Sequence, residues 1–244
     1  MLSFIVPAYN EEFELTATLE AIRVAAGEQP HEIMVVDDGS TDRTAALARE
    51  AGAKLISICR RQIAAARNQG GHAAIGEILF FVDADTRINS QHVSGALAAL
   101  QDGYAGGSSR VRIDGAIPIW SRICLKVFCA VYFGLNLGAG AFLFTTKQNF
   151  DAIGGFDESF FIGEEVYFSL ALRKLGRFRI LAEPIVTSGR KLRLYSAREL
   201  VRSLRVILRG PRAARSREHL DIWYDGKRET NSAFANSPLR DEST

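Results

Sequence analysis

Two carboxylates stand two residues apart, Asp83 and Asp85, directly after the apolar run Ile-Leu-Phe-Phe-Val at 78–82. If the strand geometry persists, both side chains point to one face, because side-chain direction alternates along a strand. Two anionic groups on one face repel each other unless a cation lies beside them. Mg²⁺ or Mn²⁺ fits this arrangement, because both ions prefer carboxylate, water and phosphate oxygens. The alternative is a solvated acidic turn or a helix N-cap.

A second acidic pair, Asp37 and Asp38, ends another apolar run at 33–36. This pair is expected to border the same cleft as Asp83 and Asp85. The alternative is that the region caps the following helix through Ser40 or Asp42. Arg67 lies in an alanine-rich helical stretch just before 78–82, where its cation could meet a diphosphate. The alternative is a surface arginine whose stem lies along apolar neighbours.

The elements that must position these residues alternate between short apolar runs and helical patterns, which favours a parallel sheet built of βαβ units. The expected strands are 3–6, 33–36, 54–58 and 78–82, with helices at 15–22 and 42–50. In an open parallel sheet the carboxyl ends of the strands border one crevice, where ligands bind. The polar residues that follow three of these runs are therefore expected to converge. Further strands are expected at 108–113 and 141–146, and a helix at 164–175.

The chain has 244 residues, of which 47% are hydrophobic and 24% charged. This composition excludes collagen-like, low-complexity and wholly disordered classes, and the length suits one large domain with or without an appendage. Three cysteines without a CxxC pair argue against a disulfide framework or a thiolate zinc site. The first residues lack a basic signal-peptide region and no stretch of 18 uncharged apolar residues occurs, so a cytoplasmic location is expected.

Five ordered segments resemble the motifs of the inverting, nucleotide-sugar-dependent family 2 glycosyltransferases. They are VPAYNEE at 6–12, VVDDGSTD at 35–42, ARN at 66–68, FVDAD at 81–85, and GGFD at 154–157 with GEE at 163–165. The resemblance covers roughly residues 2–187 and implies a GT-A fold, an open, mainly parallel α/β sheet with helices on both faces. The expected domains are a catalytic domain at 1–187 and a basic amphipathic segment at 188–244.

The resemblance also implies roles for individual residues. Pro7, Ala8, Tyr9 and Glu11 would line the base and ribose pocket, Asp38 would accept a hydrogen bond from the base, and Arg67 would approach the base or diphosphate. Asp83 and Asp85 match the DxD metal motif, with Asp85 the direct ligand. Glu164 and Glu165 stand where the family has Glu-Asp, whose second member is the general base.

The chain departs from the family at this last position, because Glu165 replaces Asp. A carboxylate is retained with a reach one methylene longer, and the apolar neighbours Phe160, Ile162 and Val166 are expected to raise its pKa. The alternative is that both glutamates merely begin a helix, where acidic side chains favour the helix dipole.

The charge is segregated along the chain, with a net −4 over 1–186 and +6 over 187–244. Residues 190–217 contain ten Lys or Arg and one acid. Their apolar stripe with flanking arginines is typical of a helix at an anionic membrane surface, and packing on the enzyme is the alternative. Arg190 lies in a stretch that resembles the TSxR motif of a bacterial membrane-associated subset, and would steady the departing diphosphate. The apolar segment 117–133 is a second interfacial helix, an acceptor wall or a core helix, and a lipid-linked acceptor is one hypothesis.

Other functions fit the sequence less well. A sugar-phosphate nucleotidyltransferase needs a Gly-rich, Arg-containing loop after the first strand, and a dinucleotide-dependent dehydrogenase needs GxGxxG there, yet residues 7–12 contain neither glycine nor arginine. Nucleic acid is not an expected partner, because the basic segment lacks interleaved aromatic residues. A non-catalytic membrane-surface adaptor would not need the retained carboxylates. The expected partners are a nucleotide-sugar donor, an unspecified acceptor and an anionic membrane surface.

Overall fold

The structure is a computed structural model that describes residues 1–114, 137–189 and 214–215. The strands are β1 (Leu2–Ala8), β2 (His31–Asp38), β3 (Lys54–Ile58), β4 (Ile78–Val82), β5 (Thr86–Arg87), β6 (Tyr104–Asp114), β7 (Phe142–Thr146) and β8 (Arg177–Ser188). The helices are α1 (Leu15–Ala26), α2 (Thr44–Glu50), α3 (Ile63–Ala73), α4 (Ser90–Gln101), α6 (Lys147–Ile153) and α7 (Glu164–Leu175).

One eight-stranded sheet has the order β3-β2-β1-β4-β7-β6-β8-β5. The first four strands in this order pair in parallel, while β7 runs antiparallel to both of its neighbours, β4 and β6. β8 is parallel to β6 and antiparallel to β5. The α/β architecture and open sheet expected from the sequence are confirmed, with a mixed second half.

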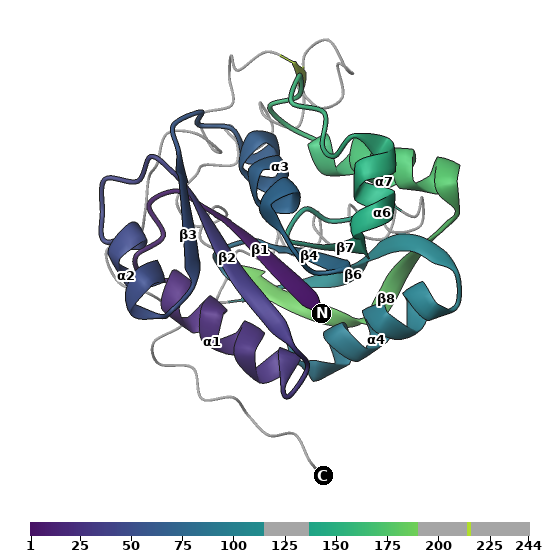
Figure 1. Cartoon of the computed structure of the whole chain (residues 1–244), viewed down its shortest axis with the longest axis horizontal. Helices are drawn as coiled ribbons and strands as arrows, with labels where there is room; N and C mark the ends of the chain where they lie inside the picture. The colour runs from purple at the N-terminus through teal and green to yellow at the C-terminus, as the bar shows by residue number, and fades with distance from the viewer. Residues whose placement is uncertain (115–136, 190–213, 216–244) are drawn as a thin grey trace, which may run out of the picture.

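Helices cover both faces of the sheet, as Figure 1 shows. On one face α1 and α4 contribute Leu19 and Val93 to a core that also contains Phe80 of β4. On the other face α3, α6 and α7 contribute Ala64, Phe150 and other buried side chains to a second core. The central strand β4 is apolar on both sides because both faces are covered there.

Two glycines let α3 lie directly on the sheet and on α6. A Cβ at Gly70 would lie 2.3 Å from Ile5 Cγ2, and one at Gly71 would lie 2.5 Å from the Phe150 ring. Any larger residue would push the helix outward. This close approach fixes the position of Arg67, one turn earlier on the same helix.

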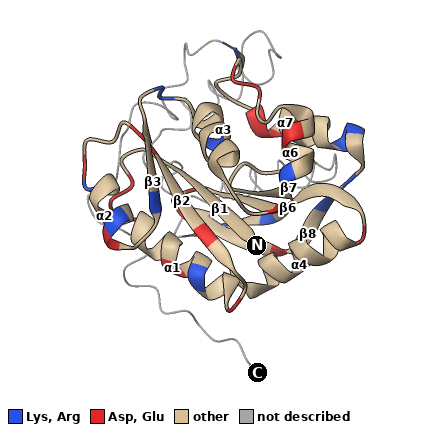
Figure 2. Ribbon diagram, in the orientation of Figure 1, with Lys and Arg blue, Asp and Glu red and all other residues tan. Residues whose placement is uncertain are grey.

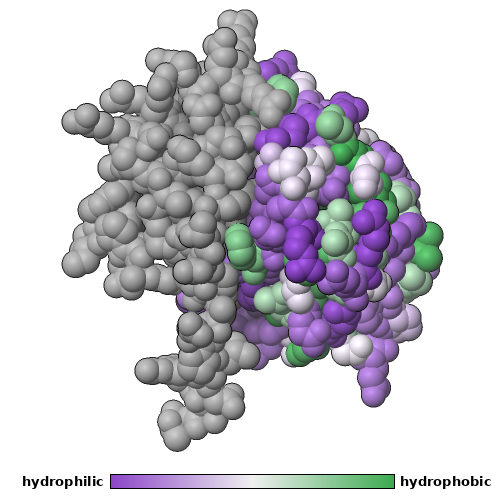
Figure 3. Space-filling model, turned by 90° about the vertical axis from the view of Figure 1, so that its left-hand side faces the viewer, coloured by the Kyte–Doolittle hydropathy of each residue, from purple (hydrophilic) through white to green (hydrophobic). Residues whose placement is uncertain are grey.

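The surface of the described part carries scattered large hydrophobic residues, among them Phe13, Val24 and Ile75. In the view of Figure 3 such residues are interspersed with hydrophilic ones. Among the helices that the structure describes, none is long and apolar enough to cross a membrane. Most of the expected basic segment 188–244 and all of the apolar segment 117–133 lie outside the described residues.

Candidate active site

The carboxyl ends of β1, β2 and β4 lie at the same edge of the sheet. Ala8 pairs with Asp37 across β1 and β2, and Ile5 pairs with Phe81 across β1 and β4. Asp38 ends β2, and Asp83 directly follows β4. Because neighbouring strands lie about 4.8 Å apart and β1 stands between the two, these ends are roughly 10 Å apart. This register confirms that the polar residues at the ends of β2 and β4 come to the same end of the sheet, as the sequence predicted.

The segment 83–85 is a turn rather than a continuation of β4. The strand ends at Val82, and the Thr86 amide donates a hydrogen bond to the Asp83 carbonyl at 3.0 Å. The condition for placing both carboxylates on one face, a strand that continues through Asp85, is therefore not met, because β4 ends at Val82. The Asp85 carboxylate instead accepts a hydrogen bond from the Thr187 hydroxyl of β8 at 3.3 Å.

A divalent cation at this edge would find few protein ligands. Within the ranges 1–114, 137–189 and 214–215, no group of three or more His, Cys, Asp or Glu side chains is arranged to hold a metal. The Asp83 side chain is 29% exposed and Asp85 is partly exposed, so both oxygen groups are accessible. Hard carboxylate oxygens fit Mg²⁺ or Mn²⁺, which usually take one or two carboxylates and complete their shell with water and substrate phosphate.

Arg67 lies at the centre of a buried ionic cluster. Its side chain is 1% exposed, and Nη1 donates to Glu164 Oε1 at 2.7 Å while Nη2 donates to Asp83 Oδ1 at 3.0 Å and to the Gly140 carbonyl at 2.9 Å. Burial opposes its charge, but Asp83, Glu164 and Glu165 outweigh that effect and hold the pKa of Arg67 above its ordinary value. The surface-arginine alternative is therefore excluded. Within the described residues, the buried Arg67 Nε has no hydrogen-bond partner.

The two glutamates lie at the beginning of α7, beside α3. Figure 2 shows the start of α7 in red, on the same side of the sheet as α3. Glu164 is 4% exposed and is bound to Arg67, whereas Glu165 is partly exposed. Although part of the residue is exposed, its carboxyl is surrounded by protein atoms, and this desolvation together with the negative charge of Glu164 raises the pKa of Glu165 to about 8. The neighbouring guanidinium opposes this rise.

Gly140 provides the surface on which these side chains meet. A Cβ at this position would lie 3.1 Å from Arg67 Nη2 and 3.6 Å from Glu165 Cγ. The structure thus brings Arg67, Asp83, Glu164 and Glu165 together, with Gly140 against them. The carboxyl of Glu165, with its raised pKa, and the carboxylate of Asp83 consequently belong to one cluster.

The residues expected to hold a nucleotide have different environments. Ala8 lies in the core on the α1 face, and Pro7 is buried within β1. Glu11 is 8% exposed, and its amide donates to Thr44 Oγ1 at 2.7 Å. Tyr9 is partly exposed, and the Arg61 guanidinium lies over its ring.

The Asp38 carboxylate holds the loop before α3. Its Oδ1 accepts from the amides of Arg60 and Arg61 at 2.6 and 2.8 Å, and its Oδ2 accepts from the amide of Gln62 at 2.6 Å. Asp38 therefore organises the backbone that enters α3.

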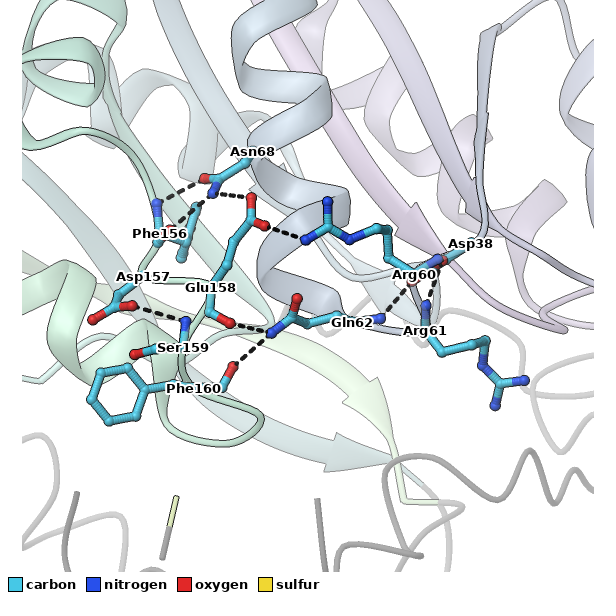
Figure 4. A network of polar contacts seen from close by, with 10 residues as sticks. All are labelled: Asp38, Arg60, Arg61, Gln62, Asn68, Phe156, Asp157, Glu158, Ser159 and Phe160. Carbon is cyan, nitrogen blue, oxygen red and sulfur yellow. Dashed lines mark hydrogen bonds and ion pairs between the residues drawn. The ribbon is translucent and has the colours of Figure 1, made fainter. Parts of the chain in front are cut away.

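A polar network continues from this loop to residues 156–160, as Figure 4 shows. Glu158 accepts from Arg60 Nη2 at 2.8 Å and from Asn68 Nδ2 at 3.0 Å. Asn68 also exchanges two hydrogen bonds with the backbone of Phe156, at 2.8 and 2.9 Å. The ARN and GGFD segments are thus joined, and α7 with its two glutamates begins seven positions after the end of GGFD.

Three features of the site were not identified from the sequence. Arg61, Glu158 and Gly140 have no pattern that marks them, because their roles depend on contacts with residues distant in the chain. Arg190, expected near the diphosphate, lies outside the described residues.

Comparison with protein families finds a match to the family model described as glycosyl transferase family 2, over residues 3–159. An undecaprenyl-phosphate 4-deoxy-4-formamido-L-arabinose transferase of Aeromonas hydrophila is 31% identical over 118 residues, which are 43% of this chain and 35% of that protein. A 4,4'-diaponeurosporenoate glycosyltransferase of Staphylococcus haemolyticus is 35% identical over 111 residues, 43% of this chain and 28% of that protein. The chain aligns with about a third of the length of these curated relatives.

Solved structures share the fold at low sequence identity. TarS residues 1–349 from S. aureus in complex with UDP-GlcNAc has a TM-score of 0.60 at 20% identity, covering 85% of this chain and 65% of that chain. The mannosyltransferase PcManGT from Pyrobaculum calidifontis, in complex with GDP-Man and Mn²⁺, has a TM-score of 0.62 at 22% identity, covering 84% and 60%.

Proposed function

The chain belongs to glycosyl transferase family 2, and from that premise we propose that it is an inverting glycosyltransferase. It moves a sugar from a nucleoside diphosphate sugar to an acceptor hydroxyl. The observation that carries this proposal is the cluster at Arg67, where Asp83 from the end of β4 meets Glu164 and Glu165 from the start of α7. This arrangement supports a donor on one side and a proton acceptor on the other.

The donor lies along the carboxyl edge of β1, β2 and β4 in this proposal. Its base occupies the pocket beside Tyr9, which Pro7, Ala8 and Glu11 shape from β1 and the loop after it, and Asp38 borders the pocket. Two structural neighbours are complexes with UDP-GlcNAc and with GDP-Man, which supports a nucleotide-sugar donor.

Asp83 and Asp85 would hold Mg²⁺ or Mn²⁺, with Asp85 as the direct ligand. A divalent cation would neutralise the charge that develops on the departing diphosphate. Arg67 keeps Asp83 in place and balances the negative charge of the two glutamates. Arg190 is a further candidate for contact with the diphosphate.

Glu165 is the general base. The acceptor oxygen attacks the anomeric carbon of the sugar, the bond from that carbon to the diphosphate breaks, and the acceptor proton passes to the Glu165 carboxylate. A positioned base of this kind contributes roughly 10²–10⁴-fold to a rate. Glu164 is bound to Arg67 and positions that arginine rather than accepting the proton.

The acceptor is proposed to be lipid-linked and presented at the cytoplasmic face of a membrane. The support is the undecaprenyl-phosphate in the name of the Aeromonas hydrophila relative and the basic composition of 188–244. The chain would then act as a peripheral membrane enzyme.

A thermal-stability titration with UDP and GDP, with and without Mn²⁺, tests the proposal against the non-catalytic adaptor. A ligand that binds only the folded state raises the melting temperature. A transferase is stabilised by at least one nucleotide, and more strongly with Mn²⁺. No response to either nucleotide at millimolar concentration would favour the adaptor.

A further inference from the structure

The Arg61 guanidinium lies over the ring of Tyr9, the residue that follows β1. Its Cζ is 3.3 Å from the centre of the Tyr9 ring, well inside the ~6 Å over which a cation is attracted to an aromatic face. In Figure 4 the Arg61 side chain extends away from the network around Glu158. Arg60, its neighbour in sequence, is part of that network instead. Two adjacent arginines thus have separate roles.

Two residues next to Tyr9 in space have an unusual backbone conformation. Among the described non-glycine residues, positive φ angles occur at Asn10, with φ 52°, and at Arg61, with φ 50°. Such angles are uncommon for residues with a side chain, although Asn adopts them more readily than Arg, and those that the surroundings over-determine cluster at active sites and ligand clamps. One of these residues follows Tyr9 in the chain and the other covers its ring.

Contacts from the end of β2 and the loop after it hold both conformations. The Arg61 amide donates to Asp38 Oδ1 at 2.8 Å, the Asn10 amide donates to Ser40 Oγ at 2.9 Å, and Asn10 Oδ1 accepts from the Thr41 amide at 2.8 Å. Three backbone amides in total occupy the Asp38 carboxylate, which has about four acceptor sites. Asp38 therefore acts on the Tyr9 pocket mainly through the loop that carries Arg61.

We propose that Arg61 closes the nucleobase site, so that the base of the donor lies between the Tyr9 ring and the Arg61 guanidinium. In the ligand-free protein the planar guanidinium occupies the position of the base on the Tyr9 ring. When the base binds, the guanidinium moves away from the ring by the thickness of the base and covers its other face. A guanidinium stacks readily on aromatic faces, and every nucleobase has such a face. This inference rests on the proposed function, because it takes the donor to be a nucleotide sugar.

Binding measured by isothermal titration calorimetry at constant Mn²⁺ tests the inference. The ligands are UDP, GDP and pyrophosphate, and the proteins are wild type, Arg61→Ala, Arg61→Lys and the control Arg43→Ala. Arg43 is an exposed arginine that pairs with Glu50, so its removal changes the net charge equally without touching Tyr9. Alanine at position 61 keeps the same φ requirement as arginine, and Arg61→Gly relieves it should Arg61→Ala fold poorly.

The expected result is a loss of about tenfold in affinity for UDP or GDP in Arg61→Ala, in line with one stacked cation. The affinity of Arg61→Ala for pyrophosphate stays within twofold of wild type. Arg61→Lys loses nearly as much affinity for UDP or GDP as Arg61→Ala does, and Arg43→Ala binds all three ligands like wild type. An equal loss for pyrophosphate would overturn the inference, because Arg61 would then act as a charge near the diphosphate. Unchanged or tighter UDP and GDP binding in Arg61→Ala would overturn it too. If wild type bound neither nucleotide, the proposed function itself would fail.

Discussion

Arg67 and Glu164 are 97 positions apart in the chain, yet Nη1 of the arginine donates to Oε1 of the glutamate at 2.7 Å with both side chains buried. The pair joins α3 to the start of α7. It places Glu165, the next residue, beside the carboxylate that follows β4. The geometry of the proposed site therefore depends on one buried ion pair.

Breaking this pair is expected to destabilise the protein. In Glu164→Ala the buried Arg67 cation loses one of its two carboxylate partners, and the free energy of unfolding falls by about 3 kcal/mol. Urea denaturation measures this change. The control Glu50→Ala removes an exposed partner of Arg43 and changes stability by less than about 1 kcal/mol. A similar small effect for Glu164→Ala would contradict the buried ion pair.

The rate of transfer is expected to rise with pH toward 8. A carboxyl whose pKa is raised to about 8 is largely protonated at neutral pH and accepts a proton only once it ionises. The profile of kcat/KM against pH should therefore rise through this range and then level off. Glu165→Gln should lower kcat by 10²-fold or more and flatten the rise. A wild-type profile that is flat from pH 6 to 9 would argue against Glu165 as the base.

The same shift predicts the pH dependence of stability. The folded state holds the Glu165 proton up to about pH 8, whereas the unfolded chain releases it near 4.5. The folded state thus binds more protons between these values, and the stability from this group is lost as pH rises from 4.5 to 8. Glu165→Gln, which cannot ionise, should gain stability relative to wild type as pH increases. Parallel stability curves for the two proteins over that window would refute the raised pKa.

The link between Asn68 and the loop 156–160 should control how firmly that loop is held. Asn68→Ala removes two hydrogen bonds to the Phe156 backbone and one to Glu158, and we expect a loss of about 2 kcal/mol. Hydrogen exchange at the Phe156 amide should be faster in Asn68→Ala than in wild type, because this amide loses its acceptor. Asn149→Ala, which removes a hydrogen bond to the Ala105 carbonyl on another part of the fold, is the control. Unchanged exchange at Phe156 in Asn68→Ala would show that the loop is held by other contacts.

Metal binding is expected to depend on Asp85. Asp85→Asn should lose the additional stabilisation that Mn²⁺ gives in the presence of UDP or GDP, because an amide oxygen is a weaker ligand for a hard cation than a carboxylate. Asp102→Asn is the matched control, since Asp102 is an exposed aspartate at the end of α4. Thermal shifts with and without EDTA measure the effect. An unchanged Mn²⁺ response in Asp85→Asn would remove Asp85 from the metal site.

The first half of the sheet could be predicted because its signals are local. Apolar runs with the bounds of β3 and β4, and a helical pattern with the bounds of α7, occur in the sequence as the structure has them. The convergence of Asp38 and Asp83 at one edge follows from parallel pairing alone. By contrast, β8 reads Arg-Phe-Arg-Ile-Leu-Ala-Glu-Pro, with charges and a proline that conceal a strand.

The details of the site depend on contacts that no local pattern contains. The burial of Arg67 results from its partners Asp83 and Glu164, which are 16 and 97 positions away. The turn at 83–85 closes through a backbone hydrogen bond, so the period-two rule for Asp83 and Asp85 does not apply. The positive φ of Arg61 is set by Asp38 from β2. Each of these features arises only once distant segments have packed together.

The most direct test of the account is donor hydrolysis and transfer by the purified full chain, screened over UDP-, GDP- and dTDP-sugars with Mn²⁺. Wild type should turn over at least one of these donors, and Glu165→Gln should lose that turnover while still binding the corresponding nucleotide. Turnover by Glu165→Gln at the wild-type rate, or no turnover of any donor by wild type that does bind nucleotide, would contradict a sugar-transfer site built around Arg67.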